Sequence, residues 1–453
     1  MRCTTCSNAP RPRGDGSMTQ SIDTRALTLG PLSKARGAVS LPGSKSISNR
    51  TLLLSALAEG TTTLRNLLDA DDIDRMADAL TALGVRIARD RPAMRCIVDG
   101  VRGDFPQRRT KLFLGNAGTA FRPLTAALAV VGGDYELSGV ERMHERPIGD
   151  LVDALRMLGC DLRYLRKAGY PPLAIGRSGG EAGADVRIRG DVSSQFLSAL
   201  LLALPLARGA QSRGTRVALT TPLISQPYVA MTTNLMWRFG VTVDTPDEKT
   251  FHIPAGAHYR SPGVIDVEGD ASTASYFLAA GVVGGGPVRV AGVSRDSIQG
   301  DVGFADVLAE QGADIRFGND FIEARAGAPL RGGVLDCAAI PDAAMTLAVT
   351  ALFAAAPMRL VNIGSWRVKE TDRIAAMATE LAKVGASVTA GADWIQVAPA
   401  RFRSATVDTY DDHRMAMSLS LAAFGGVEIT INEPSCVRKT FPGYFDALRA
   451  IAS

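Results

Sequence analysis

Cationic side chains recur in this sequence beside glycine, serine and amide residues, a combination suited to binding anions. Leu114 to Leu124 (LGNAGTAFRPL) lies between the short apolar run KLFL and the helical composition of LTAALAVV. Backbone N–H groups at a helix start carry partial positive charge, and glycine lets a ligand approach them closely. The segment therefore predicts an anion site around Gly118 and Thr119, with Pro123 in the first helical turn. A tight strand-to-helix turn capped by Asn116 is the alternative.

A second cationic cluster precedes the helical run TLLLSALA. Leu41 to Arg50 reads LPGSKSISNR, with a Pro-Gly turn, three serines, an asparagine and two cations. The nucleotide-binding pattern G-x-x-x-x-G-K-[ST] does not fit it, because Val39 and Ser44 hold the glycine positions when Lys45 is taken as the lysine. The cluster therefore argues against a nucleoside triphosphate as the ligand.

A third cluster carries charges of both signs. In RVKETDR the residues Arg367, Glu370 and Arg373 recur at the spacing that shares a helical face. A solvated face is the alternative interpretation of such a charge pattern. Two later motifs, YDDHRMAM and CVRKTF, add His413, Arg414 and Lys439.

The elements that must position these residues form an internal repeat. DALTALGVRI, DALRMLGCDL, NLMWRFGVTV, VLAEQGADI and ELAKVGASV each read as the end of an amphipathic helix, a glycine cap and then a strand. A final helix, FDALRAIAS, resembles a sixth copy cut short. The cap glycines are Gly84, Gly159, Gly240, Gly312 and Gly385. A repeat as long as the spacing between successive cap glycines predicts a compact helix-and-sheet unit that is used about six times.

Length and composition place limits on the function. A chain of 453 residues fits two large domains, and 46% apolar, 6% aromatic and 21% charged residues are typical of a globular protein. A net charge of +4 is too small to indicate nucleic acid or an anionic membrane as partner. The six scattered cysteines suit a reducing cytoplasm, and the single pair Cys3 and Cys6 with only four histidines predicts no metal site. Residues 1–17 are expected to be a disordered leader, with Met18 an alternative start.

Nine motifs together resemble one family. LPGSKSISNR, LGNAGTAFRPL, ERPIGDLVDAL, VSSQF, ISQPY, IPDAAMT, RVKETDR, DDHRMAM and RKTFPGYF are similar, in the same order, to the motifs of the 5-enolpyruvylshikimate-3-phosphate synthase family. The resemblance spans about residue 26 to the C-terminus. It implies an α/β (α+β) fold of two lobes, each with three repeated helix-and-sheet units in an inside-out α/β barrel-like arrangement. The implied domains are 44–268 as the N-terminal lobe and 18–43 plus 269–453 as the C-terminal lobe. The chain then crosses between lobes near Pro42 to Ser44 and near Glu268 to Asp270.

The resemblance also implies a reaction. Members of this family transfer the enolpyruvyl (carboxyvinyl) group of phosphoenolpyruvate to the 5-hydroxyl of shikimate 3-phosphate and release phosphate, without a cofactor. By carry-over, phosphoenolpyruvate is expected at Lys45, Asn116, Gly118, Arg146, Gln195, Arg373, Arg414 and Lys439. Shikimate 3-phosphate is expected at Lys45, Ser46, Arg50, Ser193, Ser194, Gln195, Ser225, Tyr228, Asp342 and Lys369.

Two carboxylates remain for proton transfer. Asp342 is the candidate base at the 5-hydroxyl, and Glu370 is the candidate for the methylene proton, with Lys45 assisting. A helix N-cap before AAMTLAVTALFAA is the plainer interpretation of Asp342, and both roles are compatible. For Glu370 the plainer interpretation is an ion pair with Arg373 or Lys369.

Other positions receive supporting roles. Arg122 is expected to pair with a carboxylate such as Asp270 or Asp412, and His413 to be a cap or supporting residue rather than a proton carrier. The family usually has asparagine where this chain has Ser365, so that substrate contact stays open. The other histidines, His144, His252 and His258, receive no role.

Two other functions are alternatives to this one. The sister enzyme that acts on UDP-N-acetylglucosamine usually carries a reactive cysteine near the position of ERMHER, where this chain has none, and Cys160 is expected to be buried. A non-enzymatic phosphate-binding protein on the same scaffold would not need Asp342 and Glu370. The resemblance further implies a cytoplasmic monomer. It also implies inhibition by glyphosate in competition with phosphoenolpyruvate, since Gly118, Thr119 and Pro123 match the sensitive pattern.

Overall fold

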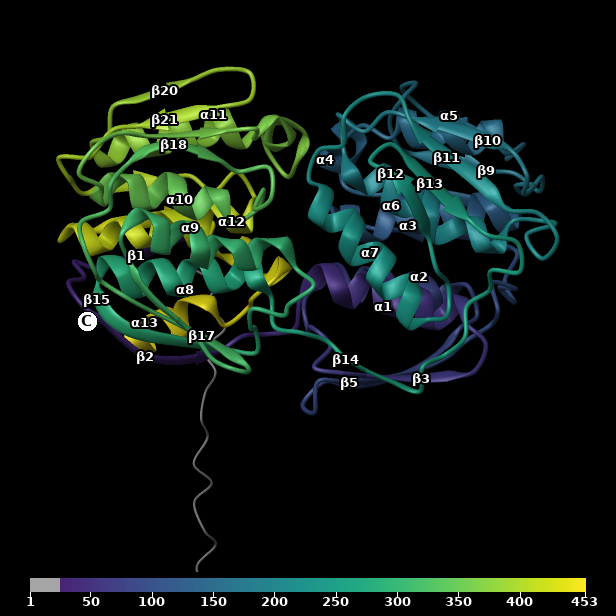
Figure 1. Ribbon diagram of the computed structural model, residues 1–453, viewed down its shortest axis with the longest axis horizontal. Coiled ribbons are helices and arrows are strands. Elements are labelled where there is room, and N and C mark those ends of the chain that lie inside the picture. Colours follow the sequence, from purple (N-terminus) through teal and green to yellow (C-terminus); the bar gives the residue numbers. More distant parts are fainter. Residues whose placement is uncertain (1–24) are drawn as a thin grey trace, which may run out of the picture.

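Two separate hydrophobic cores divide the chain into two lobes (Figure 1). The computed structural model describes residues 25–453. One core takes its buried residues from the segment 47–267, and the other from 29–41 and 271–451. We call the parts built around them the N-terminal lobe and the C-terminal lobe. The expected leader, with Cys3, Cys6 and Met18, lies outside the described residues.

Each lobe carries three sheets. In the N-terminal lobe their strands, in spatial order, are β14 (Val264–Asp266), β3 (Thr61–Arg65), β5 (Arg95–Asp99) and β4 (Arg86–Asp90); β6 (Arg109–Phe113), β7 (Asp134–Ser138), β9 (Leu173–Ile175) and β8 (Leu162–Tyr164); and β10 (Asp185–Ile188), β11 (Thr215–Leu219), β13 (Thr250–Ile253) and β12 (Asp244–Asp247). In the C-terminal lobe they are β2 (Ala35–Ser40), β15 (Gly285–Ala291), β17 (Phe321–Arg325) and β16 (Asp314–Phe317); β18 (Gly333–Asp336), β19 (Met358–Val361), β21 (Ile395–Val397) and β20 (Val388–Ala390); and β22 (Ala405–Val407), β23 (Ile429–Asn432) and β1 (Ala26–Leu29).

The same pairing pattern occurs in all six sheets. The first two strands in each list are parallel, and every further neighbour is antiparallel. Parallel neighbours need a crossover connection, which is usually a helix. In four units this helix follows the first strand directly, as in β6–α3–β7. The predicted α/β architecture of repeated helix-and-sheet units is therefore confirmed.

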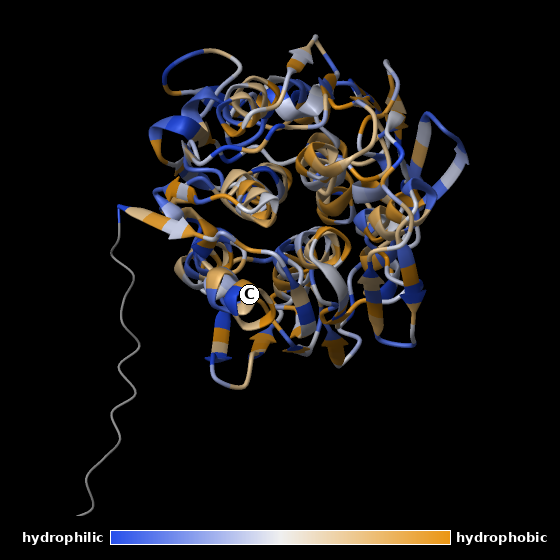
Figure 2. Cartoon of the chain, turned by 90° about the vertical axis from the view of Figure 1, so that its left-hand side faces the viewer, coloured by the Kyte–Doolittle hydropathy of each residue, from blue (hydrophilic) through white to orange (hydrophobic). Residues whose placement is uncertain are grey.

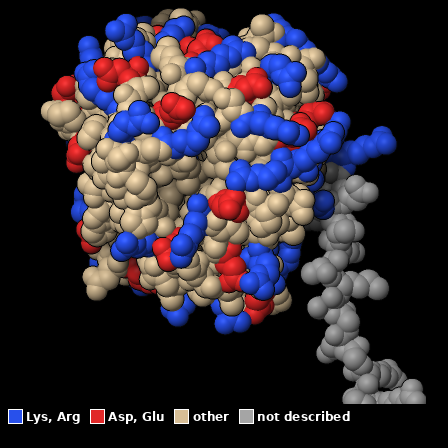
Figure 3. Space-filling view, turned by 90° about the vertical axis from the view of Figure 1, so that its right-hand side faces the viewer, with Lys and Arg blue, Asp and Glu red and all other residues tan. Residues whose placement is uncertain are grey.

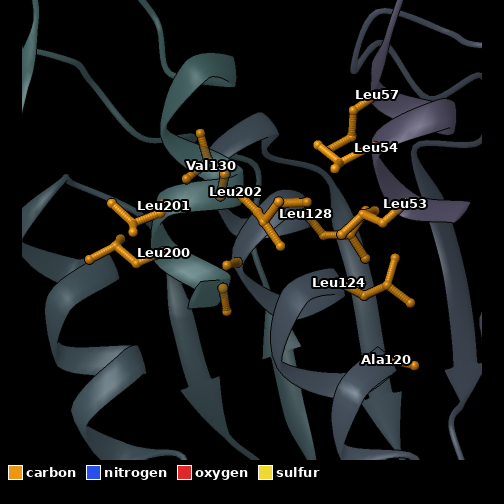
Figure 4. Close-up of a cluster of buried hydrophobic side chains, with 14 of the residues drawn as sticks. Leu53, Leu54, Leu57, Ala120, Leu124, Leu128, Val130, Leu200, Leu201 and Leu202 are labelled. Carbon is orange, nitrogen blue, oxygen red and sulfur yellow. The ribbon is translucent and has the colours of Figure 1, made fainter. Parts of the chain in front are cut away.

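One helix of each unit lies inside its lobe. These inner helices are α1 (Lys45–Leu57), α3 (Gly118–Val131) and α6 (Ser194–Ala203) in the first lobe, and α8 (Ala271–Val283), α10 (Ala344–Thr350) and α12 (His413–Ser420) in the second. They are buried along nearly their whole length, because most of their own residues, on every face of the helix, are small or aliphatic. Figure 4 shows leucines of α1, α3 and α6 meeting in one cluster, and Figure 2 shows hydrophobic residues concentrated on the central helices of the C-terminal lobe.

The second helix of each unit is amphipathic and ends at a glycine where the sequence predicts one. These helices are α2 (Asp71–Ala82), α5 (Gly149–Met157), α7 (Gln226–Arg238), α9 (Phe304–Gln311) and α11 (Arg373–Val384), with α13 (Tyr444–Ile451) as the sixth. The five predicted cap glycines have φ values between 85° and 118°, a region that residues with a side chain rarely adopt.

No helix in the described range 25–453 is long and apolar enough to cross a membrane. Basic and acidic side chains mix on the far end of the N-terminal lobe (Figure 3).

Two local predictions were wrong. Pro123 lies in the second turn of α3 and not in its first, because the helix begins at Gly118, where Phe121 N–H already bonds to Ala117 O at 2.9 Å. Arg367 and Arg373 do not share a helical face. The 3-10 helix η4 (Gly364–Val368) ends before Glu370, and Asp372 caps a new helix that begins at Arg373.

The chain crosses between the lobes twice, and the two crossings lie side by side. Gly43 and Gly269 form an antiparallel bridge, in which Ser44 N donates to Glu268 O at 2.8 Å and Asp270 N donates to Pro42 O at 3.0 Å. A Cβ on Gly43 would overlap Asn66 O, so the crossing passes too close to its neighbour for a side chain. Strand β2 pairs with β15 within the C-terminal lobe, and β14 pairs with β3 within the N-terminal lobe.

Candidate active site

The N-termini of several inner helices meet at a cavity of about 510 Å³ between the lobes. Lys45 and Ser46 begin α1, Gly118 and Thr119 begin α3, Ser194 and Gln195 begin α6, and Arg414 lies in the first turn of α12. Asn49 Nδ2 donates to Thr119 Oγ1 at 2.7 Å and fixes α1 against α3. Helix starts carry partial positive charge, so this geometry favours an anionic ligand before any side chain is counted.

The cavity brings together most of the residues that the sequence predicts for the site. Those that line it are Lys45, Ser46, Arg50, Gly118, Arg146, Ser194, Gln195, Tyr228, Asp342, Lys369, Glu370, Arg373 and Arg414. Ser193 and Ser225 instead line an adjoining cavity of about 350 Å³, together with Arg122 and Ser365. Asn116 and Lys439 line neither cavity but touch each other across the lobes, where Lys439 Nζ donates to Asn116 O at 2.9 Å.

Three buried arginines near the cavity have no carboxylate within 4.0 Å among residues 25–453: Arg50, Arg122 and Arg146. Burial lowers the pKa of Arg50 to about 10, and burial with the neighbouring Arg146 holds the pKa of Arg122 well below its usual value. The Nε atoms of Arg122 and Arg146 have no hydrogen-bond partner among the described residues. Buried charges are costly unless paired, so these guanidinium groups favour a negatively charged ligand.

The predicted pairing of Arg122 with Asp270 or Asp412 was wrong. Arg122 Nη2 donates to Pro147 O at 3.1 Å, while Asp270 caps α8 through Thr273 N at 2.8 Å. Asp412 accepts from Arg373 instead, at 2.7 Å. Both carboxylates are already engaged by donors in the C-terminal lobe, and the Arg122 guanidinium lies instead near Gly118 of its own helix.

Asp342 accepts hydrogen bonds from Tyr228, Arg373 and Arg414, forms an ion pair with Lys369, and caps no helix. Tyr228 Oη donates to it at 2.7 Å, Arg373 lies 3.0 Å away, Arg414 3.2 Å and Lys369 3.5 Å. The N-cap prediction was wrong because α10 begins only at Ala344, after Ala343. Burial alone would raise the pKa of Asp342, but Arg414, Lys369 and Arg373 hold it well below its usual range.

Glu370 shares Arg373 with Asp342, but its other neighbouring cations are different. Arg373 Nη2 donates to it at 2.9 Å and Lys439 Nζ lies 3.4 Å away, whereas Lys369, the other expected partner, faces Asp342. Burial would raise the pKa of Glu370, yet Lys439, Arg373, Arg146 and Lys45 hold it well below its usual range. Both candidate carboxylates are therefore ionised in the free protein.

Arg373 joins the two carboxylates. Its side chain is only 1% exposed and contacts Asp412 at 2.7 Å, Asp342 at 3.0 Å and Glu370 at 2.9 Å. These neighbours raise the pKa of Arg373 despite its burial. Asp412 in turn caps α12 by accepting from Arg414 N at 2.9 Å.

Lys45 has a carboxylate partner that the sequence analysis missed. Asp72 is buried, lines the cavity, and lies 3.5 Å from Lys45 Nζ and 3.8 Å from Lys439 Nζ. Burial lowers the pKa of Lys45, against the opposing effects of Asp72 and Glu370. The sequence signal was present, because Asp72 stands among acids in the first turn of an amphipathic helix, but those acids also suit a helix start.

Asp301 was also missed. It lines an adjoining cavity of about 280 Å³ and accepts from Ser272 Oγ and, at 3.5 Å, from Tyr228 Oη. Burial and the nearby Asp342 raise the pKa of Asp301 to about 6. A Gly-Asp pair ahead of an amphipathic helix gives no signal beyond helix capping.

His413 is buried beside the cavity without contributing a proton. Neither ring nitrogen has a hydrogen-bond partner among the described residues, and Asp412 is the cap of the helix that His413 begins. Burial, Lys45 and Arg414 lower the pKa of His413 well below its usual value. The imidazole is therefore neutral, and of the two expected roles, cap or supporting residue, the cap is excluded because Asp412 holds that position.

Comparisons with known proteins identify relatives over most of the chain. The family model described as EPSP synthase (3-phosphoshikimate 1-carboxyvinyltransferase) matches residues 30–448. Proteins named 3-phosphoshikimate 1-carboxyvinyltransferase from Burkholderia ambifaria and Burkholderia vietnamiensis are 58% and 59% identical over 94% of this chain and 99% of their own. A solved EPSP synthase from Acinetobacter baumannii has a TM-score of 0.79 at 25% identity, over 94% of this chain and 98% of that chain. The enolpyruvyl transferase NikO from Streptomyces tendae, with a TM-score of 0.72 at 18% identity over 94% and 98%, shares the fold.

Proposed function

Because the chain belongs to the EPSP synthase family, the 3-phosphoshikimate 1-carboxyvinyltransferases, we propose that the cavity between its lobes is the site of enolpyruvyl transfer. The enzyme transfers the enolpyruvyl group of phosphoenolpyruvate to the 5-hydroxyl of shikimate 3-phosphate in the shikimate pathway and releases phosphate. The observation that carries the assignment of the site is its charge. Six cations and three carboxylates line the cavity, which leaves an excess of positive charge for two substrates that bring two phosphates and two carboxylates.

Phosphoenolpyruvate binds, in this proposal, between the two lobes beside the start of α3. Its groups are recognised by Lys45, Asn116, Gly118, Arg146, Gln195, Arg373, Arg414 and Lys439. In support, Arg146 Nη1 donates to Asn116 O at 3.2 Å and Lys439 donates to the same carbonyl from the other lobe. Cations from both lobes are thereby held around the start of α3.

Shikimate 3-phosphate binds mainly to the N-terminal lobe. The proposed contacts are Lys45, Ser46, Arg50, Ser193, Ser194, Gln195, Ser225, Tyr228, Asp342 and Lys369. Arg50 supports this assignment because Thr232 Oγ1 and Ser46 O fix its guanidinium at 2.8 and 3.0 Å without neutralising its charge. Ser365 lines the same adjoining cavity as Ser193 and Ser225, and we propose that it contacts this substrate directly or through water.

The reaction requires four proton movements. The 5-hydroxyl oxygen forms a bond to C2 of phosphoenolpyruvate while Asp342 takes the hydroxyl proton and Glu370 protonates the methylene carbon, with Lys45 assisting. The tetrahedral intermediate then loses a proton from that carbon back to Glu370 as the bond from C2 to the phosphate oxygen breaks. Phosphate departs with the electron pair of that bond and takes up the proton that Asp342 accepted, so Asp342 is ionised again.

Glu370 is ionised in the free enzyme, so substrate binding must raise its pKa before it can donate a proton. Incoming phosphate and carboxylate groups compete with Glu370 for Arg373 and Lys439, which lie 2.9 and 3.4 Å from it. When these cations turn toward the substrate, the effect of burial on Glu370 is less opposed and its pKa rises. The proton that Glu370 needs for the methylene carbon therefore becomes available in the complex.

We propose the lobe boundaries expected from the sequence, with 44–268 as one lobe and 18–43 plus 269–453 as the other, closing on each other when substrate binds. The paired crossings at Gly43 and Gly269 support a hinge there. We also propose that the enzyme is a cytoplasmic monomer.

Glyphosate is proposed to occupy the phosphoenolpyruvate position, and Gly118→Ala tests this. A Cβ on Gly118 would lie 2.7 Å from both Arg122 Nη1 and Arg146 Nη2, so the guanidinium groups must move away from the anion. We expect a higher inhibition constant for glyphosate and a higher KM for phosphoenolpyruvate, measured by steady-state inhibition. Gly149→Ala, whose Cβ meets nothing closer than 3.4 Å, is the control. Inhibition that is not competitive with phosphoenolpyruvate, in the unmodified enzyme, would contradict the proposal.

A phosphate-release assay tests the proposed function against a non-enzymatic phosphate-binding protein. We expect release only when phosphoenolpyruvate and shikimate 3-phosphate are both present, and loss of that release in Glu370→Gln. UDP-N-acetylglucosamine should not replace shikimate 3-phosphate, because residues 30–448 match the EPSP synthase family. Binding of both substrates without turnover by the unmodified chain would refute the proposal.

A further inference from the structure

An arginine on the N-terminal lobe reaches the backbone of the C-terminal lobe at the edge of the site. Arg142 lies in α4 (Glu141–Glu145), a short helix on the side of its lobe that faces the other lobe (Figure 1). Its Nε donates to Glu370 O at 2.9 Å and its Nη2 donates to Lys369 O at 3.0 Å. The planar guanidinium thus holds two successive carbonyl groups at once.

Those two carbonyls belong to the segment that carries both a proposed catalytic residue and a proposed substrate contact. Lys369 directs its amine to Asp342 at 3.5 Å, while Glu370 directs its carboxylate to Arg373 and Lys439. The segment lies between the end of η4 at Val368 and the start of α11 at Arg373. Within residues 25–453 neither carbonyl accepts a hydrogen bond from another backbone group.

The partner of these carbonyls therefore comes from the opposite lobe. Backbone carbonyls away from water need a donor, and a charged donor makes the stronger hydrogen bond. The guanidinium of Arg142 is also held by its own helix, because its Nη1 donates to Glu145 Oε2 at 2.8 Å. The guanidinium can bind both carbonyls only when the lobes have approached each other.

We propose that Arg142 is a positioning residue that couples the approach of the lobes to the placement of Lys369 and Glu370. It touches neither substrate. When the lobes separate, the 369–370 segment loses its two donors and the carboxylate of Glu370 loses its fixed direction. When they approach, the same two hydrogen bonds complete the site. This inference rests on the proposed function only in the choice of its kinetic readout.

The test compares Arg142→Ala and Arg142→Lys with Arg166→Ala. Arg166 is exposed and serves as the control position. Its Nη1 lies 3.6 Å from Glu141, which belongs to the same helix as Arg142, and it has no contact with the 369–370 segment. For Arg142→Ala we expect about a 10- to 100-fold loss of kcat/KM for phosphoenolpyruvate, mostly in kcat, because two hydrogen bonds from a charged donor are lost. Arg142→Lys should recover part of that loss, since one amine can still serve one carbonyl. Arg166→Ala should stay within about twofold of the unmodified enzyme.

Two further measurements separate positioning from a merely structural role. The melting temperature of Arg142→Ala should stay within about 2 °C of the unmodified enzyme, and its affinity for shikimate 3-phosphate alone within about threefold. Small-angle scattering should show a less compact Arg142→Ala in the presence of that substrate. Unchanged kcat, or an equal fall in kcat, substrate affinity and melting temperature, would overturn the proposal.

Failure of the proposed function is distinguishable from failure of this inference. If the unmodified chain does not release phosphate, the function fails, and the inference is then decided by scattering of the free proteins alone. A larger radius of gyration for Arg142→Ala than for Arg166→Ala supports the contact between lobes. Equal radii overturn it.

Discussion

Replacing Asp342 by asparagine is expected to lower kcat about 10²- to 10⁴-fold, the range that general base catalysis contributes. Arg414, Lys369 and Arg373 hold the pKa of Asp342 well below its usual range, so the carboxylate is ionised and able to take a proton at neutral pH. Asparagine keeps the shape and can still accept from Tyr228 Oη, which lies 2.7 Å from the carboxylate, but it cannot take the hydroxyl proton. Single-turnover phosphate release, with substrate affinity measured separately, checks this.

The control for that variant lies six residues earlier. Asp336 is exposed and accepts only from Ala338 N at 2.9 Å within its own turn, so Asp336→Asn should leave kcat within about twofold. If Asp342→Asn retained kcat within tenfold, Asp342 would not be the base. A rise in KM for shikimate 3-phosphate without a fall in kcat would assign it to binding alone.

Arg373→Met is expected to destabilise the C-terminal lobe by about 3–5 kcal/mol at neutral pH, the cost of removing one partner from buried ion pairs. The variant leaves Asp342, Glu370 and Asp412 buried without the cation that contacts all three. Denaturant unfolding followed by a probe in that lobe measures the loss. We also expect a fall in kcat/KM for phosphoenolpyruvate, because the proposed anion contact disappears.

The destabilisation by Arg373→Met should shrink as the pH falls from about 7 to about 5. Without Arg373 the pKa values of Asp342 and Glu370 rise, because fewer cations then oppose the effect of burial, so the folded variant gains stability when these carboxyls are protonated. Arg367→Met is the matched control, since Arg367 pairs with Asp372 at 2.7 Å but is part-exposed, and it should cost less than about 1 kcal/mol. A loss in Arg373→Met that does not depend on pH would contradict the ionised network.

The repeated architecture could be predicted from the sequence because its signals are local. A glycine at each of Gly84, Gly159, Gly240, Gly312 and Gly385 ends a helix through its own backbone conformation, whatever lies elsewhere in the chain. Most residues that line the cavity were predicted from motifs, and several of those motifs lie at the starts of inner helices. Helix starts can be identified from a few neighbouring residues.

Partners far apart in the sequence could not be predicted in the same way. Arg122 was assigned a carboxylate in the other lobe, but Asp270 and Asp412 already accept from Thr273 N and Arg373. Charge alone does not say which of several acids an arginine meets. A capping role was predicted for Asp342 because capping signals are local. Its actual partners are distant in the sequence: Lys369, Arg373 and Arg414 lie 27 or more positions away, and Tyr228 lies in the other lobe.

The paired crossings have a consequence for how the protein is made. The N-terminal lobe is an insertion between β2 and α8, and its last strand, β14, completes the sheet that begins at β3. All parts of the inserted lobe are therefore synthesised before β15, and Ala35 to Ser40 remain without their partner strand until Gly285 to Ala291 emerge. The inserted N-terminal lobe can fold first, whereas the C-terminal lobe is completed only near the end of translation. A nascent chain that ends before Lys439 lacks one of the cations proposed to bind the two acidic metabolites.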